Sequence, residues 1–282
     1  MNNPIQKMFD ALPRHYELVN HVITFGLNTV WRKKTAGVAS RVGRIPLACS
    51  SGPGAAAGQP SRGQTTCEGA PDTSTAAGQP SLGGATASPA RWDDSIWLDV
   101  STGTGEMAEL LSRLTNPNTT VLATDFSLPM LRKAALKKNV RTRKILLAVA
   151  DDGLLPLRDD SLDLVTISLG TRNLNTTRSA LVSCFAEFHR VLKPGGWFVN
   201  LETSQPRSRA VRALFHGYVR AFLKPVASAI SGNRSAYSYL ARTICSFNGP
   251  EELAAIIREA GFTRVEVTKL FLGVAAIHEA RK

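Results

Sequence analysis

The chain has 282 residues, 43% of them hydrophobic, which is enough apolar material for one large folded domain or two small ones. No stretch approaches eighteen uninterrupted apolar residues, so the sequence predicts no membrane-spanning helix. The formal net charge of +12 suits nucleic acid, an anionic membrane or an acidic substrate as a partner, and does not choose among them.

The first residues lack the apolar core of a secretory signal peptide. The four cysteines, at positions 49, 67, 184 and 245, show neither C-x-x-C pairing nor the spacing of metal ligands. We therefore expect reduced thiols, no metal site and a cytoplasmic protein.

Residues 1–40 are predicted to form an N-terminal helical cap, because apolar residues recur at roughly helical spacing from Met8 to Trp31. Pro13 and Gly26 are expected to interrupt the helices. Such a cap either covers a ligand site or simply pads the core, and this segment alone favours padding.

Residues 41–93 differ from the rest of the chain in composition. They contain nine of the 22 glycines and six of the 15 prolines, and Ala-Ala-Gly-Gln-Pro-Ser occurs twice, at 56–61 and 76–81. Such a tract cannot bury enough apolar surface to offset the entropy of ordering it, so we predict a disordered, low-complexity insertion.

Residues 94–282 alternate between strand and helix patterns, which predicts a mostly parallel sheet covered on both faces. The predicted strands are 96–100, 120–124, 144–149, 161–168, 196–202, 263–269 and 272–279, and the predicted helices lie near 104–114, 127–138, 177–191, 207–223, 235–246 and 249–260. Because only Leu270 and Phe271 separate the last two strands, these strands must be antiparallel.

The first of these strands ends at a glycine-rich turn, Ser101-Thr102-Gly103-Thr104-Gly105, and a helical pattern follows. Glycine allows a tight turn and close approach of the backbone to a ligand, and the helix N-terminus offers unpaired N–H groups. Asp125 ends the next strand, twenty residues past Gly105, where an acid can accept both hydroxyls of a ribose. The pattern predicts a cradle for a nucleotide or a carboxylate.

Three interpretations of this cradle are open. The Gly103-x-Gly105-x-x-Ala108 spacing fits the dinucleotide site of an NAD(P) oxidoreductase, but that match alone is weak. The same elements form the S-adenosylmethionine site of a methyltransferase, and an ordinary strand-turn-helix without a ligand is the third possibility. Seven strands with a final antiparallel hairpin favour the class I S-adenosylmethionine-dependent methyltransferase fold, because a plain dinucleotide fold has six parallel strands.

Other candidates follow from the rule that ligands of open α/β sheets bind at the carboxyl ends of the strands. Thr104 and the glycine turn suit the amino-acid end of S-adenosylmethionine. Asp151 or Asp152, after the third strand, would accept a hydrogen bond from the adenine amine, although this pair also suits a turn cap. The candidates after the fourth strand are Ser168, Gly170, Arg172 and Asn173.

The predicted helix 207–223 carries an apolar stripe together with several basic residues. A basic amphipathic helix suits a membrane surface or a hydrophobic substrate with an anionic head. A core-facing helix with a solvated basic face is an equal alternative.

The chain resembles the C-methyltransferases of menaquinone and ubiquinone biosynthesis over residues 1–40 and 94–282. The shared motifs are Lys7-Met8-Phe9 with Tyr16 and Asn20, Trp31-Arg32-Lys33, the strand and glycine turn 98–105, Asp125-Phe126-Ser127, Gly170-Thr171-Arg172-Asn173, Leu192-Lys193-Pro194-Gly195-Gly196 and Leu201-Glu202-Thr203-Ser204-Gln205-Pro206. The last of these is similar to the menaquinone branch.

This resemblance implies methylation of demethylmenaquinol to menaquinol, with Thr104, Asp125, Asp151, Asp152 and Ser168 at cofactor-binding positions. The turn residues Gly103 and Gly105 are predicted to bind the cofactor from the pattern of the cradle itself. The ring carbon must be made electron-rich by ionising a quinol hydroxyl, so we predict that Arg172 stabilises the phenolate or orients a water and that Asn173 holds the ring oxygen. The rival candidates are His15, Tyr16, Glu202, His216 and Tyr237. Two departures stand out: Thr171 replaces an apolar residue, and Asp151-Asp152 replaces Asn-Ala.

The expected partners are a polyprenylated quinol and an anionic membrane, the latter met peripherally at its inner, cytoplasmic face. No nucleic acid is expected, and a homo-oligomer is left open. The alternatives are a ubiquinone-pathway or dual-substrate enzyme and, more distantly, an NAD(P) oxidoreductase.

Overall fold

The computed structural model describes residues 4–10, 16–43, 95–137, 139–140, 145–174 and 177–282. All of them belong to one of the two units into which the chain divides, made of residues 1–47 and 92–282. Nearly all of the predicted insertion, 44–93, lies outside the described residues. Its predicted disorder therefore stays a prediction.

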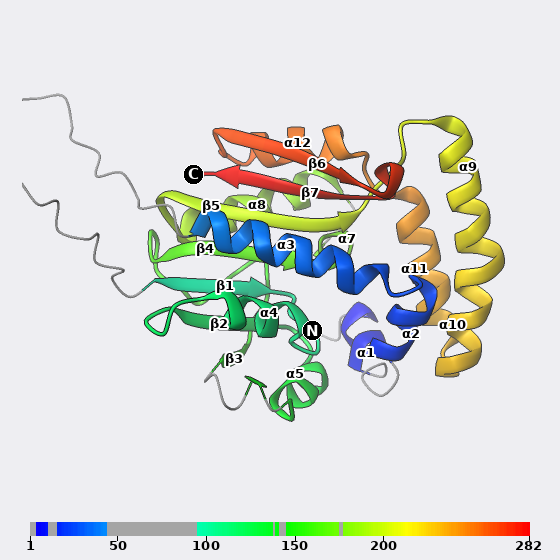
Figure 1. Ribbon diagram of the computed structural model, residues 1–282, viewed down its shortest axis with the longest axis horizontal. Helices are drawn as coiled ribbons and strands as arrows, with labels where there is room; N and C mark the ends of the chain where they lie inside the picture. The colour runs from blue at the N-terminus through cyan, green and yellow to red at the C-terminus, as the bar shows by residue number, and fades with distance from the viewer. Residues whose placement is uncertain (1–3, 11–15, 44–94, 138, 141–144, 175–176) are drawn as a thin grey trace, which may run out of the picture. The chain divides into compact units, whose positions relative to one another are not determined.

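Seven strands form one sheet in the order β3-β2-β1-β4-β5-β7-β6, and all seven predicted strands are found (Figure 1). Their bounds are β1 Ile96–Val100, β2 Thr120–Asp125, β3 Leu146–Val149, β4 Leu162–Ser168, β5 Leu192–Thr203, β6 Arg264–Leu270 and β7 Ala275–Arg281. The first five strands are parallel, and β7 is antiparallel to both of its neighbours, β5 and β6. The predicted fold class is confirmed.

Helices cover both faces of the sheet because side chains alternate along each buried strand. Trp97 of β1 packs with helices α3 and α4 on one face, whereas its neighbour Leu98 packs with α8 and α12 on the other. The bounds are α1 Pro4–Asp10, α2 Tyr16–Ile23, α3 Leu27–Gly43, α4 Glu106–Leu114, α5 Leu128–Ala135, α7 Thr171–Leu174, α8 Arg178–Val191, α9 Arg209–Tyr218, α10 Lys224–Ser231, α11 Arg234–Ser246 and α12 Pro250–Glu259.

A third layer of helices stands at the edge of the sheet toward which the parallel strands point (Figure 1). Helices α2, α9, α10 and α11 belong to this layer and pack on one another through a separate apolar cluster. Thus the cap helices and the helices after β5, far apart in sequence, enclose the carboxyl ends of the strands.

Three local features differ from the prediction. The helix predicted at 207–223 is α9 continued by a π-helical segment, Val219–Leu223, and then by α10 to residue 231. The four-residue helix α7 was not predicted. The last two strands are joined by a 3-10 turn, Phe271–Gly273, rather than by two residues, and they are antiparallel as predicted.

No helix among the described residues combines the length and the apolar character that crossing a membrane requires.

Candidate functional site

A small polar cavity of about 30 Å³ lies beside the glycine turn, at the carboxyl ends of β1, β2 and β4. Six of the predicted site residues line it, Gly103, Thr104, Asp125, Ser168, Gly170 and Asn173, and so does the rival candidate Tyr16. The other lining residues are Phe9, Arg32, Ser101, Thr102, Glu106, Phe126, Met130 and Leu169. Residues from the cap, the sheet edge and α7 thus meet around one space.

The glycine turn has the geometry that its sequence predicts. Gly103 and Gly105 have φ angles of 60° and 78°, in the left-handed region that glycine adopts without strain. A Cβ on Gly103 would meet only the Tyr16 ring, at 3.9 Å, whereas a Cβ on Gly105 would lie 3.1 Å from Ala134 Cβ. Gly103 therefore leaves space on the cavity side. Gly105, the N-cap of α4, instead allows close packing on α5.

Asp125 is buried at the end of β2 and accepts two backbone hydrogen bonds, from Gly103 N and Ser127 N, each of 2.8 Å. Burial raises the pKa of its carboxyl to about 6, and the two N–H donors only partly offset this. Among the described residues its carboxylate has no cationic partner in an ion pair. A ligand that donates hydroxyl hydrogens would supply the stabilisation that this carboxylate lacks.

Asp151 and Asp152 are not among the described residues that line the polar cavity. Asp152 is buried beneath the turn, where the Ser101 hydroxyl donates to its Oδ2. Burial, helped by the negative charges of Asp125 and Asp151, raises the pKa of Asp152 to about 8. Asp151 is exposed and accepts a hydrogen bond of 2.9 Å from Gly153 N, which is the turn-capping alternative. Their role toward an adenine stays a prediction.

Two charged residues of the cavity were missed by the sequence analysis. Arg32, on α3, is buried and forms an ion pair with Glu106, in the first turn of α4. Its Nε also donates to Ser168 Oγ at 3.2 Å. Arg32 occurs in the Trp31-Arg32-Lys33 motif, but three basic residues in a row give no reason to select one of them.

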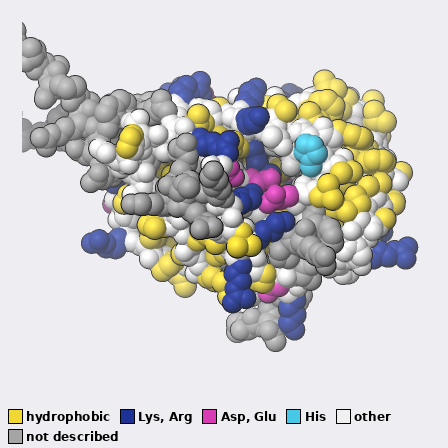
Figure 2. All heavy atoms as spheres, turned by 60° about the horizontal axis from the view of Figure 1, so that its bottom comes forward, with side chains coloured by type: hydrophobic (Ala, Val, Ile, Leu, Met, Phe, Trp, Pro, Cys, Tyr) yellow, Lys and Arg dark blue, Asp and Glu magenta, His cyan; other side chains and the backbone are white. Residues whose placement is uncertain are grey.

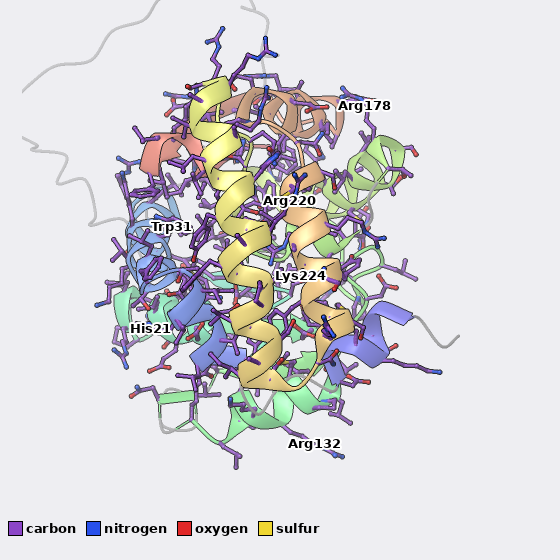
Figure 3. The ribbon with its side chains drawn as sticks, turned by 90° about the vertical axis from the view of Figure 1, so that its right-hand side faces the viewer. His21, Trp31, Arg132, Arg178, Arg220 and Lys224 are labelled. Carbon is purple, nitrogen blue, oxygen red and sulfur yellow. The ribbon has the colours of Figure 1, made fainter. Side chains whose placement is uncertain are left out.

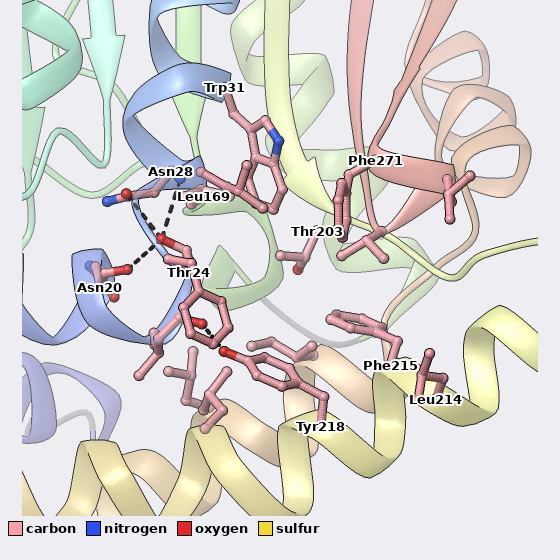
Figure 4. A pocket seen from close by; sticks show the side chains of 18 of the residues that line it. Asn20, Thr24, Asn28, Trp31, Leu169, Thr203, Leu214, Phe215, Tyr218 and Phe271 are labelled. Atoms are coloured by element: carbon pink, nitrogen blue, oxygen red, sulfur yellow. Dashed lines mark hydrogen bonds between the residues drawn. The ribbon is translucent and has the colours of Figure 1, made fainter.

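A larger apolar cavity of about 430 Å³ lies next to the polar one (Figure 4). Leu169 lines both cavities. The large cavity is lined by Asn20, Ile23, Thr24, Phe25, Leu27, Asn28, Trp31, Leu169, Arg172, Thr203, Val211, Leu214, Phe215, Tyr218, Leu223, Leu240, Ile244, Phe271, Leu272 and Val274. Much of the apolar stripe predicted on helix 207–223 therefore faces this cavity, and no residue of α9 is buried.

The mouth of this cavity is hydrophobic. Phe25, Leu214, Phe271 and Leu272 line it and are 72%, 78%, 61% and 76% exposed. Figure 2 shows hydrophobic side chains gathered at the end of the described unit where α9 and α10 stand in Figure 1. Figure 3 shows that α9 and α10 run as one long helix along this end, with Arg220 and Lys224 on it and Trp31 of α3 to its left in this view.

The consecutive residues Arg172 and Asn173 line different cavities, Arg172 the apolar one and Asn173 the polar one. Arg172 Nη1 donates to the buried carboxylate of Glu202 at 2.6 Å, and its backbone N donates to the other oxygen at 3.2 Å. Among the described residues, Arg172 Nε and Asn173 Oδ1 are buried without a hydrogen-bond partner. Arg172 Nε can therefore donate a hydrogen bond to a ligand, and Asn173 Oδ1 can accept one.

Most of the rival catalytic candidates in the described part of the chain do not line either cavity, unlike Arg172 and Asn173. His216 and Tyr237 line neither cavity among the described residues, and His216 Nε2 is hydrogen-bonded to Gln205 Oε1 at 2.7 Å. Tyr16 lines the polar cavity. His15 lies outside the described residues.

Backbone strain is concentrated around the two cavities. Outside glycine, the described residues with positive φ are Phe25, Ser101, Asp160, Leu169, Phe271 and Leu272. All but Asp160 line one of the cavities. Strained backbone that persists in a fold is typical of functional sites, and this distribution supports the assignment of the site.

The chain is similar in sequence to a known family of methyltransferases. Residues 87–282 match the model of the ubiE/COQ5 methyltransferase family. The chain is 31% identical over 274 residues to the ubiquinone/menaquinone biosynthesis C-methyltransferase UbiE of Desulfotalea psychrophila, covering 97% of this chain and 88% of that protein. It is 39% identical over 181 residues to the demethylmenaquinone methyltransferase of Thermus thermophilus, covering 64% and 80%.

Among solved structures, the CurJ carbon methyltransferase matches with a TM-score of 0.50 and 18% identity, covering 67% of this chain and 48% of that one. At this identity the match concerns the fold alone.

Proposed function

The chain belongs to the ubiE/COQ5 methyltransferase family, and from this premise we propose that it transfers a methyl group from S-adenosylmethionine to a ring carbon of a polyprenylated hydroquinone. The proposed reaction is the conversion of demethylmenaquinol to menaquinol. One observation carries the proposal: a polar cavity at the glycine turn and an apolar cavity share a wall at Leu169.

The polar cavity suits the cofactor. Asp125 would accept hydrogen bonds from a ribose, and Gly103 allows close backbone approach. Bound S-adenosylmethionine supplies a methyl group that its sulfonium already activates, so the protein mainly positions the acceptor carbon. Ligand pockets usually hold about 300 Å³ or more, so we propose that the polar cavity, of about 30 Å³, widens when the cofactor enters.

The apolar cavity suits the acceptor. Its volume of about 430 Å³ lies in the usual range for ligand pockets, and its walls are mainly aliphatic and aromatic. Trp31 and Phe271 approach it from one side and Phe215 and Tyr218 of α9 from the other (Figure 4). A prenylated ring would bury its tail among these side chains.

At the wall between the cavities, Arg172 and Asn173 would contact the quinol. Glu202 Oε1 accepts from Arg172 Nη1, Thr203 N and Thr203 Oγ1, at 2.6, 2.7 and 3.0 Å. Because three donors already occupy this oxygen, we assign Glu202 the role of holding the guanidinium rather than that of a general base. Arg172 then stabilises the developing phenolate, and Asn173 holds the ring oxygen.

Access from a membrane would complete the route of the substrate. The exposed side chains at the cavity mouth are hydrophobic, and Arg209 and Arg212 of α9 carry positive charge nearby. Exposed apolar residues beside basic ones are typical of proteins that lie on an anionic bilayer. We propose peripheral contact of this end with the cytoplasmic face of a membrane, where a prenylated quinol is dissolved.

The test is a methyl-transfer assay with labelled S-adenosylmethionine and separately reduced naphthoquinones and benzoquinones that carry the same prenyl tail. We expect label in the naphthoquinol ring. Label in the benzoquinol alone, or in both acceptors, would point to the ubiquinone-pathway or dual-substrate enzyme. If calorimetry detects NADH binding and no S-adenosylmethionine binding, the methyltransferase proposal is wrong.

A further inference from the structure

The inference concerns Arg32, the buried cation that the cap inserts into the polar cavity. Arg32 comes from α3, and its side chain is only 8% exposed. It makes one hydrogen bond through Nε to Ser168 at the end of β4 and one ion pair through Nη1 to Glu106 at the start of α4. Among the described residues its Nη2 donates no hydrogen bond.

The charged residues that line the polar cavity are of two kinds. Asp125 provides a carboxylate without a cation, whereas Arg32 and Glu106 provide a positive and a negative group in contact. The cofactor of the proposed function differs in the same way along its length. Its ribose end carries neutral hydroxyls, and its amino-acid end carries a carboxylate and an ammonium on one carbon.

Resting on the proposed function, we propose that the Arg32–Glu106 pair binds the zwitterionic amino-acid end of S-adenosylmethionine, Arg32 its carboxylate and Glu106 its ammonium. A guanidinium matches a carboxylate through paired N–H donors, and Nη2 keeps such donors available. The N-terminus of α4, where Glu106 lies, adds a field that favours the ligand carboxylate. Before the ligand arrives, the two side chains neutralise each other, which keeps both charges tolerable in a buried site.

The competing explanation is purely structural, because the same pair also connects α3 to α4. The two explanations differ in which ligands they affect. A purely structural pair supports the whole cavity, so its loss would weaken the binding of every adenine nucleoside to the same extent. A pair that binds the amino-acid end affects only ligands that have this end.

The experiment is titration calorimetry of the full chain with three ligands. S-adenosylhomocysteine has both charged groups, its decarboxylated analogue with a 3-aminopropyl thioether keeps only the amine, and 5′-methylthioadenosine has neither. The variants are Arg32→Met and Glu106→Gln. Arg41→Met is the matched control, because Arg41 lies on the same helix and pairs with Glu279 instead.

We expect Arg32→Met to weaken the affinity for S-adenosylhomocysteine about 10- to 100-fold. The affinities for the two ligands without a carboxylate should stay within about twofold of those of the unaltered protein. Glu106→Gln should weaken the affinity for both amine-bearing ligands and leave that for methylthioadenosine unchanged. Arg41→Met should change none of the three affinities. Thermal melting followed by circular dichroism checks that each variant is folded.

If Arg32→Met weakens the affinity for all three ligands equally, or does not weaken the affinity for S-adenosylhomocysteine, the inference is overturned while the proposed function stands. If the unaltered protein binds none of the three ligands, the proposed function fails, and the inference fails with it.

Discussion

The Asp125 carboxylate and the Gly103 amide, 22 residues apart in sequence, are joined by a hydrogen bond of 2.8 Å at the carboxyl ends of two neighbouring strands. The acid therefore takes part in shaping the turn and also faces the polar cavity. The register of β1 against β2 sets this relationship, because it brings Asp99 level with Ala123 and leaves the turn opposite Asp125.

Replacing this acid gives the first prediction. Asp125→Ala should weaken the affinity for S-adenosylhomocysteine at least about 100-fold, because two charge-assisted hydrogen bonds to the ribose are lost. Gly103 N and Ser127 N lose their acceptor, but the fold should survive because the variant also removes a carboxylate whose burial is unfavourable. Calorimetry and thermal melting measure the two effects. Asp151→Ala is the comparison, and its exposed side chain should matter far less. Equal affinity of Asp125→Ala and the unaltered protein would refute the ribose assignment.

The raised pKa of Asp125, about 6, predicts how cofactor binding depends on pH. Ribose hydroxyls donate to the ionised carboxylate, so protonation competes with binding. Affinity should be constant above about pH 7 and fall by up to tenfold per pH unit below about pH 6. Calorimetry between pH 5 and 8 measures this, and Asp125→Asn should show a weaker but flatter profile. Affinity that rises toward acid pH would contradict the assignment.

Asp152 predicts a pH dependence of stability rather than of binding. Its pKa is raised from 3.8 to about 8 in the folded state, so the folded protein binds a proton that the unfolded chain releases. The resulting stability is fully present below about pH 4 and is lost as the pH rises toward 8. Asp152→Asn keeps a similar shape without the charge. It should raise the melting temperature at pH 8 more than at pH 5. The opposite order would show that Asp152 is ionised in the fold.

The hydrophobic mouth of the large cavity predicts membrane binding. Phe25→Asp and Leu272→Asp should each reduce co-sedimentation with anionic vesicles several-fold, because an exposed apolar side chain becomes charged. Leu136→Asp is the matched control, since Leu136 is 79% exposed but lines neither cavity. If all three substitutions reduce sedimentation equally, general charge rather than the cavity mouth governs the contact.

The sheet was predictable from sequence because it depends on local signals. Buried strands such as β1 and β4 appear as short apolar runs, and the short connection before β7 dictates its direction. Gly103 and Asp125 were predictable for the same reason, since each lies at or near the end of such a run.

The features that the sequence did not predict depend on distant contacts or on segments too short to show a pattern. Arg32 reaches the site through a bond to Ser168, 136 residues away, and no periodicity reports such a contact. The four residues of α7 are too few to show a helical period. The different positions of Asp151 and Asp152, one exposed and one buried, depend on a local turn that closes onto Leu154.

The last prediction concerns Thr171, where the resemblance leads one to expect an apolar residue. Its hydroxyl donates to Asn200 Oδ1, whose Nδ2 lies 3.3 Å from His278 Nδ1, and His278 Nε2 lies 2.8 Å from the Pro250 carbonyl oxygen. Burial lowers the pKa of His278, so the neutral ring donates through Nε2 and accepts through Nδ1. This buried series of hydrogen bonds joins β7 and β5 to the helix that carries Arg172 and Asn173.

Thr171→Leu alone should lower the free energy of unfolding by about 1–3 kcal/mol, because it leaves Asn200 Oδ1 buried without a donor. The double variant Thr171→Leu/Asn200→Leu should lose less free energy of unfolding than the two single variants lose together. The difference should be about 1 kcal/mol, because the double variant has no orphaned Asn200 oxygen. Urea unfolding of the four proteins completes this double-mutant cycle. Strictly additive values would mean that Thr171 is a tolerated surplus hydroxyl and that its bond to Asn200 does not help to hold α7 in place.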